Sequence, residues 1–381
     1  MRRSGLSSAV VVLALLPLAG VGQQALERQR EGWARTYTGT LPAALRLRVN
    51  GHGPVTVNAG AARSFSYTVR LSVRAASEAE ARRILDRAPL QVVTQGDTLV
   101  LTAPGGAVMA RITVKAPRLS AVAIGTSDGA VEASGIDGTL DVNSRAGEIL
   151  ADRIHGRCAL ATGGGDVRIG TVGGPVECTT SGGNITLKLA RGDVRLETFG
   201  GDITAEQVDG SVQAQTAGGG VHVHMAGGSV NAATGGGEIV IDKANGTVTA
   251  RNMAGPVEVG AAAGVHCESA SGGVRLSRIS GPMRVSTSMG NIMADLAGAH
   301  LAESFLATSS GDITVMIPSN LGVTIRAENA MADTMRRIIS DFPAISLRRQ
   351  GSRVIGQGAV NGGGPLLQIS DTGGTIFIRR Q

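Results

Sequence analysis

The chain has 381 residues, of which 36 are Lys or Arg and 30 are Asp or Glu, giving a formal net charge of +6 at pH 7. Glycine is abundant, with 56 residues, whereas aromatic residues make up only 2% of the sequence. Because aromatic side chains dominate tight protein recognition, this composition disfavours a site that holds one partner through a few anchors. Three cysteines are too few for a fold that depends on disulfides.

Residues 1–22 are predicted to be a signal peptide. Arg2 and Arg3 provide the basic start, and the apolar stretch Ala9–Leu18 precedes small residues at the expected cleavage site. The apolar stretch is too short to span a bilayer as a helix, and no later segment is apolar enough to do so. We therefore expect an exported protein that does not span the membrane and is periplasmic, at the cell surface or extracellular.

Residues 23–118 are predicted to form a β-rich N-terminal cap. Ser77–Arg87 predicts a short amphipathic helix, with Ser77 as its N-cap and acidic residues in its first turn. Alternating apolar residues predict the strands Leu45–Val49, Val55–Val57, Phe65–Val73, Leu99–Leu101 and Ala110–Val114, of which the last two are expected to lead into the central region.

This N-terminal part is also the most basic part of the chain. Up to residue 118 there are 16 basic and 6 acidic residues, whereas residues 119–300 hold 12 basic and 18 acidic ones. Export argues against a nucleic acid as the partner. Anionic lipid, a cell-envelope polymer or another envelope protein would suit the charge, and a solvated basic surface explains it equally well. The partner stays unknown at this stage.

Residues 119–317 are predicted to form a regular solenoid. Glycine recurs every nine residues from Gly129 to Gly264 and resumes one residue early at Gly272. Apolar residues alternate after each glycine, as in Val167 and Ile169, which predicts short strands with one buried face. A Thr-x-Gly-Gly turn marks every second strand, so one coil has eighteen residues. We expect about nine or ten coils in a rod of roughly 45 Å, with glycine supplying positive φ at the turns.

Stacked coils place like residues over like and so create two polar ladders at the corners. Short polar side chains at turns usually bond neighbouring backbone groups, and we interpret both ladders in this way. The first ladder is Ser144, Thr162, Thr180, Thr198, Thr216, Thr234 and Asn252. The second is Glu148, Asp166, Asn184, Asp202, Gly220 and Glu238.

The cysteines are predicted to be buried apolar residues. Cys158 and Cys178 occupy inward strand positions one coil apart, but the eighteen-residue register sets Val176 beside Cys158 and Leu160 beside Cys178. This diagonal offset makes a disulfide difficult without backbone movement, although a bond between the two stays an alternative.

Residues 318–381 are predicted to continue the solenoid and cap it. Gly311–Val315 reads as one more repeat before this region, and Ala330–Ile339 as a helical turn. Gly373–Ile378 is expected to be the closing strand. Because a solenoid has no internal boundary, we treat the chain after residue 22 as one all-β domain, a single-stranded β-solenoid (β-helix) of two nine-residue half-repeats per coil.

Roughly residues 40–381 resemble the exported, adhesin-like β-strand-repeat family known as domain of unknown function 4097 (DUF4097). The turns that carry the resemblance are Gly165-Asp166, Gly201-Asp202, Gly311-Asp312 and, with Asn, Gly183-Asn184. The end segment is also similar, with Ser340-Asp-Phe-Pro343, Gly356-Gln-Gly358 and Gly362-Gly-Gly-Gly-Pro365. The resemblance implies a β-solenoid with an adhesin or envelope role and no catalytic residues to transfer.

One metal-ligating pattern stands out. Glu206, His224 and Asp242 lie eighteen residues apart at one outward position, with His222 beside them. These are ligand types that suit zinc, but a solvated ladder of charges explains them better, so no metal or cofactor is predicted. A calcium β-roll is excluded because it needs Asp two residues after the glycine, where this chain is apolar. A single corner row of threonines does not match the flat paired rows of an ice-binding surface.

The sequence therefore predicts a non-enzymatic, exported β-solenoid that acts as an adhesin or scaffold in a bacterial cell envelope. Outward carboxylates are scattered and do not form the paired arrangement that glycoside hydrolysis needs. Two alternatives stay open. One is an envelope-stress or regulatory module that binds anionic lipid or protein through Arg82, Arg83 and Arg87. The other is a carbohydrate-active β-helix enzyme.

Overall fold

The repeat folds into a stack of two-strand coils. Strand β14 (Cys158–Thr162) and strand β15 (Val167–Val172) form one coil, and β16 (Val176–Thr180) and β17 (Ile185–Ala190) form the next. Both strands of a coil pair in parallel with their counterparts eighteen residues later, as in Cys158 with Val176. The predicted eighteen-residue coil and all-β solenoid are confirmed.

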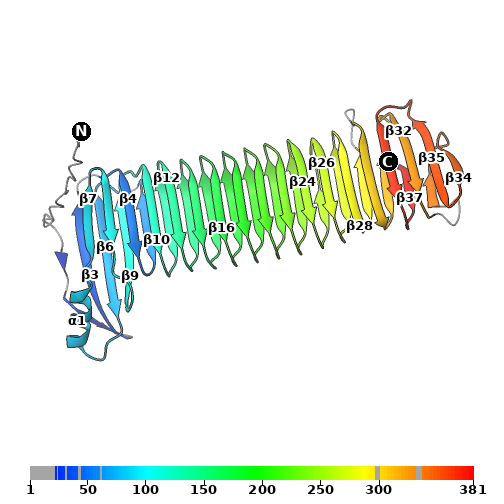
Figure 1. Ribbon diagram of the computed structural model, residues 1–381. Helices are drawn as coiled ribbons and strands as arrows, with labels where there is room; N and C mark the ends of the chain where they lie inside the picture. The colour runs from blue at the N-terminus through cyan, green and yellow to red at the C-terminus, as the bar shows by residue number, and fades with distance from the viewer. Residues whose placement is uncertain are drawn as a thin grey trace, which may run out of the picture.

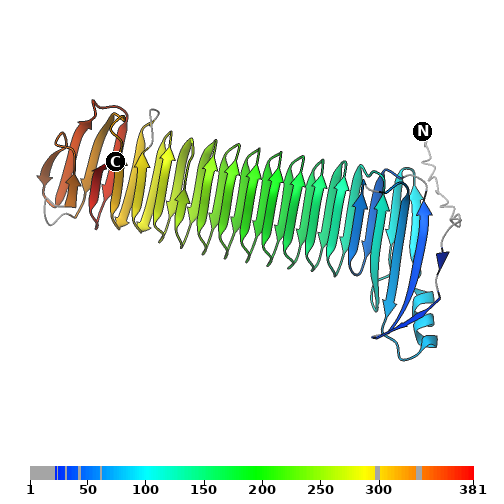
Figure 2. The same cartoon turned by 180° about the vertical axis from the view of Figure 1, so that it is seen from behind.

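The computed structural model describes residues 22–23, 25–30, 32–41, 44–60, 62–296, 301–331 and 337–381. Nearly all of the predicted signal peptide, residues 1–21, lies outside them. Within the described residues the helix α1 (Glu78–Arg87) is accompanied only by strands. The strands cross the axis of a long rod that has a lobe with α1 at one end and a small group of strands at the other (Figures 1 and 2). No helix among these residues has the length and hydropathy of a transmembrane helix.

Eleven coils follow one another along the chain, slightly more than the sequence predicts. Their first strands form one sheet, called the even sheet below: β10 (Ala121–Thr126), β12 (Thr139–Ser144), β14, β16, β18 (Val194–Thr198), β20 (Val212–Thr216), β22 (Val230–Thr234), β24 (Thr247–Asn252), β26 (Gly264–Ser269), β28 (Met283–Met289) and β30 (Ser304–Ser310). Their second strands form the odd sheet: β11 (Val131–Ile136), β13 (Ile149–Ile154), β15, β17, β19 (Ile203–Val208), β21 (Val221–Ala226), β23 (Ile239–Ala244), β25 (Val257–Val259), β27 (Val274–Ile279), β29 (Ile292–Leu296) and β31 (Ile313–Ile317).

The core is the thin layer between the two sheets. Alternate residues of each strand point into it, as Val194 and Leu196 do on β18, and both are almost completely buried. Such alternation is the pattern of a sheet with one buried face. All three cysteines are buried free thiols, with Cys158 beside Val176 and Cys178 beside Leu160. Burial raises the pKa of the Cys158 thiol to about 12, so these cysteines act as small apolar core residues.

Close packing of coils, rather than positive φ, explains most of the repeated glycines. Among the regular glycines at the Thr-x-Gly-Gly corner, Gly165, Gly183 and Gly201 do not have positive φ. A Cβ on Gly201 would instead lie closer than 3.0 Å to the carbonyl oxygen of Gly183 in the preceding coil. The neighbouring Gly200 has room, since its nearest heavy atom would be 3.8 Å away. The expectation that positive φ selects these glycines is therefore wrong for these coils.

The threonine ladder donates hydrogen bonds to the carbonyl groups of the same regular glycines. The hydroxyl of Thr198 donates to the carbonyl oxygen of Gly183 in the preceding coil at 2.9 Å and accepts the N–H of Gly201 at 3.3 Å. The second ladder works between coils as well, because the Asp202 N–H donates to Oδ1 of Asn184 at 2.8 Å. Both ladders thus bond backbone groups that the turns would leave without partners, which confirms their structural interpretation.

The order of coils at the N-terminal end differs from the chain order. The strands there are β1 (Gly22–Gln23), β2 (Glu27–Gln29), β3 (Gly32–Leu41), β4 (Arg46–Gly51), β5 (Val55–Ala59), β6 (Phe65–Val73), β7 (Gln91–Gln95), β8 (Thr98–Thr102) and β9 (Val108–Ala116). The first coil, β4 and β5, pairs with β10 and β11 on one side and with β8 and β9 on the other. The expectation that β8 and β9 lead directly into the rod is wrong, because β4 and β5 lie between them and β10 and β11.

Antiparallel strands cover the outer side of this end. Strand β6 pairs with β9, β3 pairs with β6, and β7 pairs with β8. The predicted helix is confirmed as α1, where the Ser77 hydroxyl accepts the N–H of Glu80. An ion pair of 2.7 Å between Arg35 and Asp86 links β3 to the helix. Antiparallel cover of this kind prevents a solenoid from pairing with further strands.

At the C-terminal end, too, the order of the coils in the stack differs from their order in the chain. The strands at this end are β32 (Val323–Asn329), β33 (Ile338–Ser340), β34 (Ser346–Gln350), β35 (Arg353–Val360), β36 (Leu366–Asp371) and β37 (Ile376–Arg380). The last coil of the chain, β36 and β37, inserts between β30 and β31 on one side and β32 and β33 on the other. The residues expected to close the rod are therefore inside the stack, and the antiparallel β34 and β35 cover its end.

The helical turn predicted over Ala330–Ile339 falls mainly on residues 332–336, which lie outside the described residues. Its last part is wrong, because Ile338–Ser340 is the strand β33.

Candidate functional site

The even sheet presents an uncharged polar surface in the middle of the rod. Successive coils place hydroxyl or amide side chains at equivalent outward positions of β20, β22 and β24, namely Gln213, Asn231 and Thr249, because the register repeats every eighteen residues. A shallow groove of roughly 600 Å³ runs over them and is lined there by Ser211, Ser229, Thr247, Gln213, Asn231 and Thr249; its other end is lined by the charged residues Arg157, Glu177, Asp193 and Arg195. Hydroxyl and amide groups both donate and accept hydrogen bonds, and here they recur at the spacing of neighbouring strands, about 4.8 Å.

Charged pairs bound the groove at both ends. On one side Arg157 pairs with Glu177 at 2.6 Å, and Arg195 reaches the amide oxygen of Gln213 at 3.4 Å. Near the other end, outside the lining of the groove, Arg251 on β24 pairs with Glu268 on β26 at 3.4 Å. These side chains are half exposed, so the pairs contribute little to stability and stay available to a partner.

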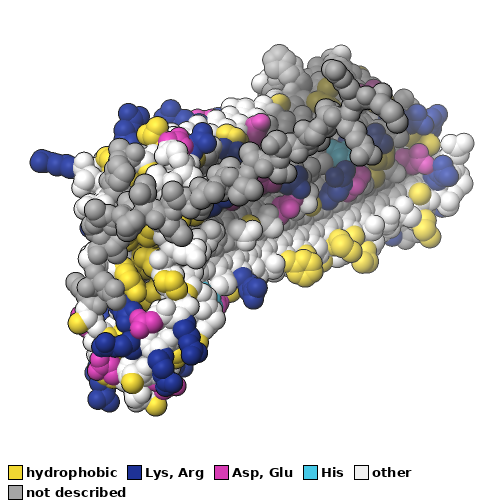
Figure 3. All heavy atoms as spheres, turned by 60° about the vertical axis from the view of Figure 1, so that its left-hand side comes forward, with side chains coloured by type: hydrophobic (Ala, Val, Ile, Leu, Met, Phe, Trp, Pro, Cys, Tyr) yellow, Lys and Arg dark blue, Asp and Glu magenta, His cyan; other side chains and the backbone are white. Residues whose placement is uncertain are grey.

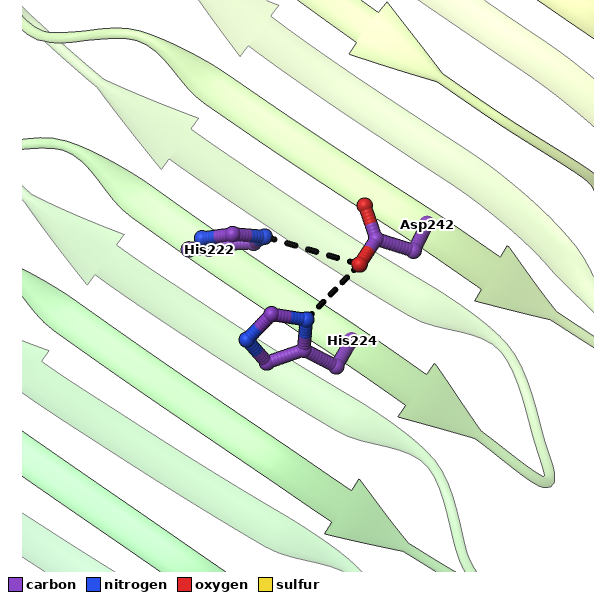
Figure 4. A group of neighbouring side chains, drawn as sticks. All are labelled: His222, His224 and Asp242. Carbon is purple, nitrogen blue, oxygen red and sulfur yellow. Dashed lines mark hydrogen bonds and ion pairs between the residues drawn. The ribbon is translucent and has the colours of Figure 1, made fainter.

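The odd sheet carries the one cluster of three potential metal ligands that the described residues form. His222 and His224 lie two residues apart on β21 and therefore face the same side, and Asp242 lies on the neighbouring strand β23 (Figure 4). Nδ1 of His224 is 2.7 Å from Oδ2 of Asp242, and Nε2 of His222 is 3.7 Å from the same oxygen. The structure does not bring Glu206, the fourth residue of the predicted pattern, into this cluster.

The carboxyl groups with shifted pKa values lie apart from one another. A hydrogen bond from Arg118 holds the pKa of Asp137 below its usual value, and one from Arg379 does the same for Asp341. Burial raises the pKa of Asp371, whose carboxylate accepts the Gly373 and Gly374 N–H groups. Each shift has a local structural cause.

The N-terminal lobe displays basic side chains next to acidic ones (Figure 3). Arg82, Arg83 and Arg87 are all exposed on α1. Arg82 forms an ion pair with Glu78 at 3.1 Å, so part of the charge of the helix is compensated within it.

Residues 174–335 match the family described as Toastrack DUF4097. This part of the chain is similar to the Toastrack family. The predicted family resemblance is thereby confirmed over these residues. The matched residues include the polar groove from Pro175 onward and the whole His222, His224 and Asp242 cluster.

Solved structures that are similar to the chain include three candidate adhesins. A candidate adhesin from Parabacteroides distasonis is 10% identical, with a TM-score of 0.34, over 75% of this chain and 98% of that one. One from Parabacteroides merdae is 11% identical, with a TM-score of 0.30, over 74% and 95%. One from Bacteroides fragilis is 12% identical, with a TM-score of 0.23, over 91% and 97%. No curated protein matches the sequence.

Sequence reasoning found the histidine cluster but missed the groove. The eighteen-residue spacing of Ser211, Ser229 and Thr247 was a detectable signal for the groove. None of these uncharged side chains indicates a binding site by itself. Only their alignment on one face of the even sheet makes them a candidate binding surface.

Proposed function

We propose that this chain is a non-enzymatic, exported β-solenoid that binds an extended polymer of the cell envelope along the even sheet, as an adhesin or a surface scaffold. The observation that carries the proposal is the part of the groove over β20, β22 and β24, where equivalent positions on successive coils offer hydroxyl or amide groups. A polymer with its own repeat can meet several of these groups at once. The Toastrack resemblance, which implies an adhesin or envelope role, supports the same proposal.

Affinity at such a surface comes from many weak contacts. One hydrogen bond contributes about 0.5–1.5 kcal/mol net, and 1.4 kcal/mol corresponds to a tenfold change in affinity. A single substitution in the groove should therefore weaken binding about tenfold at most. Three substitutions along one row should weaken it about 100-fold, if each removes about 1 kcal/mol.

Co-sedimentation of the purified chain with isolated peptidoglycan and with cell-wall polysaccharide tests this. The groove variant is Gln213→Ala/Asn231→Ala/Thr249→Ala, and we expect it to lose most of the binding. The matched control, Thr186→Ala/Thr204→Ala/Val240→Ala, changes one outward row of the odd sheet and should bind normally. Equal binding by both variants, or no binding by the unmodified chain, would refute the proposal. Release of reducing sugar during the incubation would point to a carbohydrate-active enzyme instead.

The location of the protein needs its own experiment. We expect protease added to intact cells to digest a C-terminally tagged copy, with lysed cells as the control for cleavage. Protection until lysis would place the chain inside the envelope and favour a scaffold over an adhesin.

A second candidate function is binding of anionic lipid by the N-terminal lobe, which the exposure of Arg83 and Arg87 on α1 favours. Binding to vesicles that contain anionic lipid should then fall steeply with salt. The variant Arg82→Gln/Arg83→Gln/Arg87→Gln should abolish it, whereas Arg348→Gln/Arg349→Gln at the other end of the rod should not. Binding that does not depend on salt would exclude this function.

A further inference from the structure

The cluster of His222, His224 and Asp242 has the geometry of an open metal site. Two histidines separated by one residue on a strand project from the same face, and the parallel neighbour β23 places Asp242 beside them (Figure 4). One ligand atom from each of the three side chains lies within 4.8 Å of the other two. The two imidazole rings are also close, with their centroids 4.1 Å apart.

One buried polar atom of this cluster makes no hydrogen bond. Nε2 of His222 is shielded from solvent and makes no hydrogen bond. Its distance of 3.7 Å to Oδ2 of Asp242 is too long for a hydrogen bond. Polar atoms hidden from water are normally satisfied, so this nitrogen points to a group that would occupy the space between it and the carboxylate.

The distances suit a tetrahedral zinc ion. Ligand atoms at about 2.0–2.1 Å from zinc lie about 3.3–3.4 Å from one another in a tetrahedron. The two distances to Oδ2 of Asp242, 2.7 Å from Nδ1 of His224 and 3.7 Å from Nε2 of His222, fall on either side of this value. All three side chains are 40–51% exposed, so small rotations can adjust them without disturbing the core.

The donor set also selects the class of metal. Calcium and magnesium prefer oxygen ligands alone, whereas two imidazole nitrogens and a carboxylate oxygen suit zinc and its neighbours in the first transition row. We propose that His222, His224 and Asp242 bind one zinc ion on the outer face of the odd sheet, with water at the fourth position. The sequence alone favours a solvated ladder that includes Glu206; the convergence of three ligands and the buried nitrogen without a hydrogen bond favour the metal.

Isothermal titration of the full chain with zinc chloride tests the site, using a purification tag that contains no histidine. We expect one zinc ion per chain. Each of His222→Ala, His224→Ala and Asp242→Asn should weaken binding at least about tenfold, because even the loss of a supporting residue around a metal site costs 10- to 100-fold in affinity. Thermal melting of each variant without zinc should match the unmodified chain, which separates loss of the site from loss of the fold.

His266→Ala is the matched control. His266 lies on the even sheet and has one carboxylate partner, Glu268 at 3.3 Å, but no second histidine. Its removal should leave zinc binding unchanged. A crystal soaked in zinc chloride should show an anomalous peak between the three side chains.

Any of three results would overturn the proposal. They are no stoichiometric binding by the unmodified chain, unchanged binding in the three cluster variants, or an equal loss in His266→Ala.

Discussion

Replacing Thr198 with valine tests whether the buried threonine ladder stabilises the stack of coils. Valine has nearly the same shape as threonine but lacks the hydroxyl, and Thr198 is only 7% exposed, so the change opens no cavity and removes only hydrogen bonds. Two bonds disappear: the one to the Gly183 carbonyl oxygen at 2.9 Å and the longer one from the Gly201 N–H at 3.3 Å.

The cost follows from the groups that lose a partner. A buried polar group without a partner costs about 1–3 kcal/mol. Because the bond to Gly201 is long, we place the total near 2–3 kcal/mol rather than at the sum of two full penalties. Solenoids do not unfold in one step, so urea unfolding followed by circular dichroism should be combined with hydrogen exchange of β18 and β19. Those amides should exchange on the order of 100-fold faster in the variant.

Thr204→Val is the matched control for this measurement. Thr204 is on the outer face of β19, where the same change should cost less than about 0.5 kcal/mol. If the two variants lose the same stability, the ladder does not stabilise the coils and our interpretation of its hydrogen bonds is wrong.

Four further predictions concern the core and the ends of the rod. Gly201→Ala should cost about 3 kcal/mol in urea unfolding because its Cβ meets the preceding coil, whereas Gly200→Ala, which has room, should be nearly neutral. Val194→Asp should unfold several coils and abolish exchange protection there, since it buries a charge in the core; a variant that retains its protection would contradict the register. Because burial raises the pKa of Asp371, its stabilising contribution is complete below about pH 4 and is lost as the pH rises. Asp371→Asn should therefore gain stability relative to the unmodified chain as the pH rises above about 4, and a constant difference would refute this. Finally, Cys158 and the other two thiols should resist a thiol reagent until the chain unfolds and should then all react; fewer than three reactive thiols would reveal a disulfide.

The repeat made the fold of the rod predictable. A buried alternation such as Val194 and Leu196, repeated every eighteen residues, allows one register only, because a shift by one residue would turn the apolar side chains outward. The ends were less predictable. The insertion of β4 between β10 and β8, and of β36 between β30 and β32, depends on pairing between segments that are distant in the chain.

The two candidate sites also differ in how far the sequence alone predicts them. Residue types and spacing identified His222, His224 and Asp242, but whether Glu206 joins them depends on side-chain directions that no spacing reveals. The polar groove is formed by side chains from several coils, so it can be recognised only once the stacking of the coils is known.

The sequence by itself determined the coil, its length, its buried positions and its corner ladders, because each follows from local periodicity and from backbone groups that must find partners. Only the tertiary structure decided the order of coils at the two ends, the reason for most of the regular glycines and the convergence of the histidine cluster. These depend on distances between separate coils: the space left for a Cβ between two turns, and the gap between side chains on neighbouring strands.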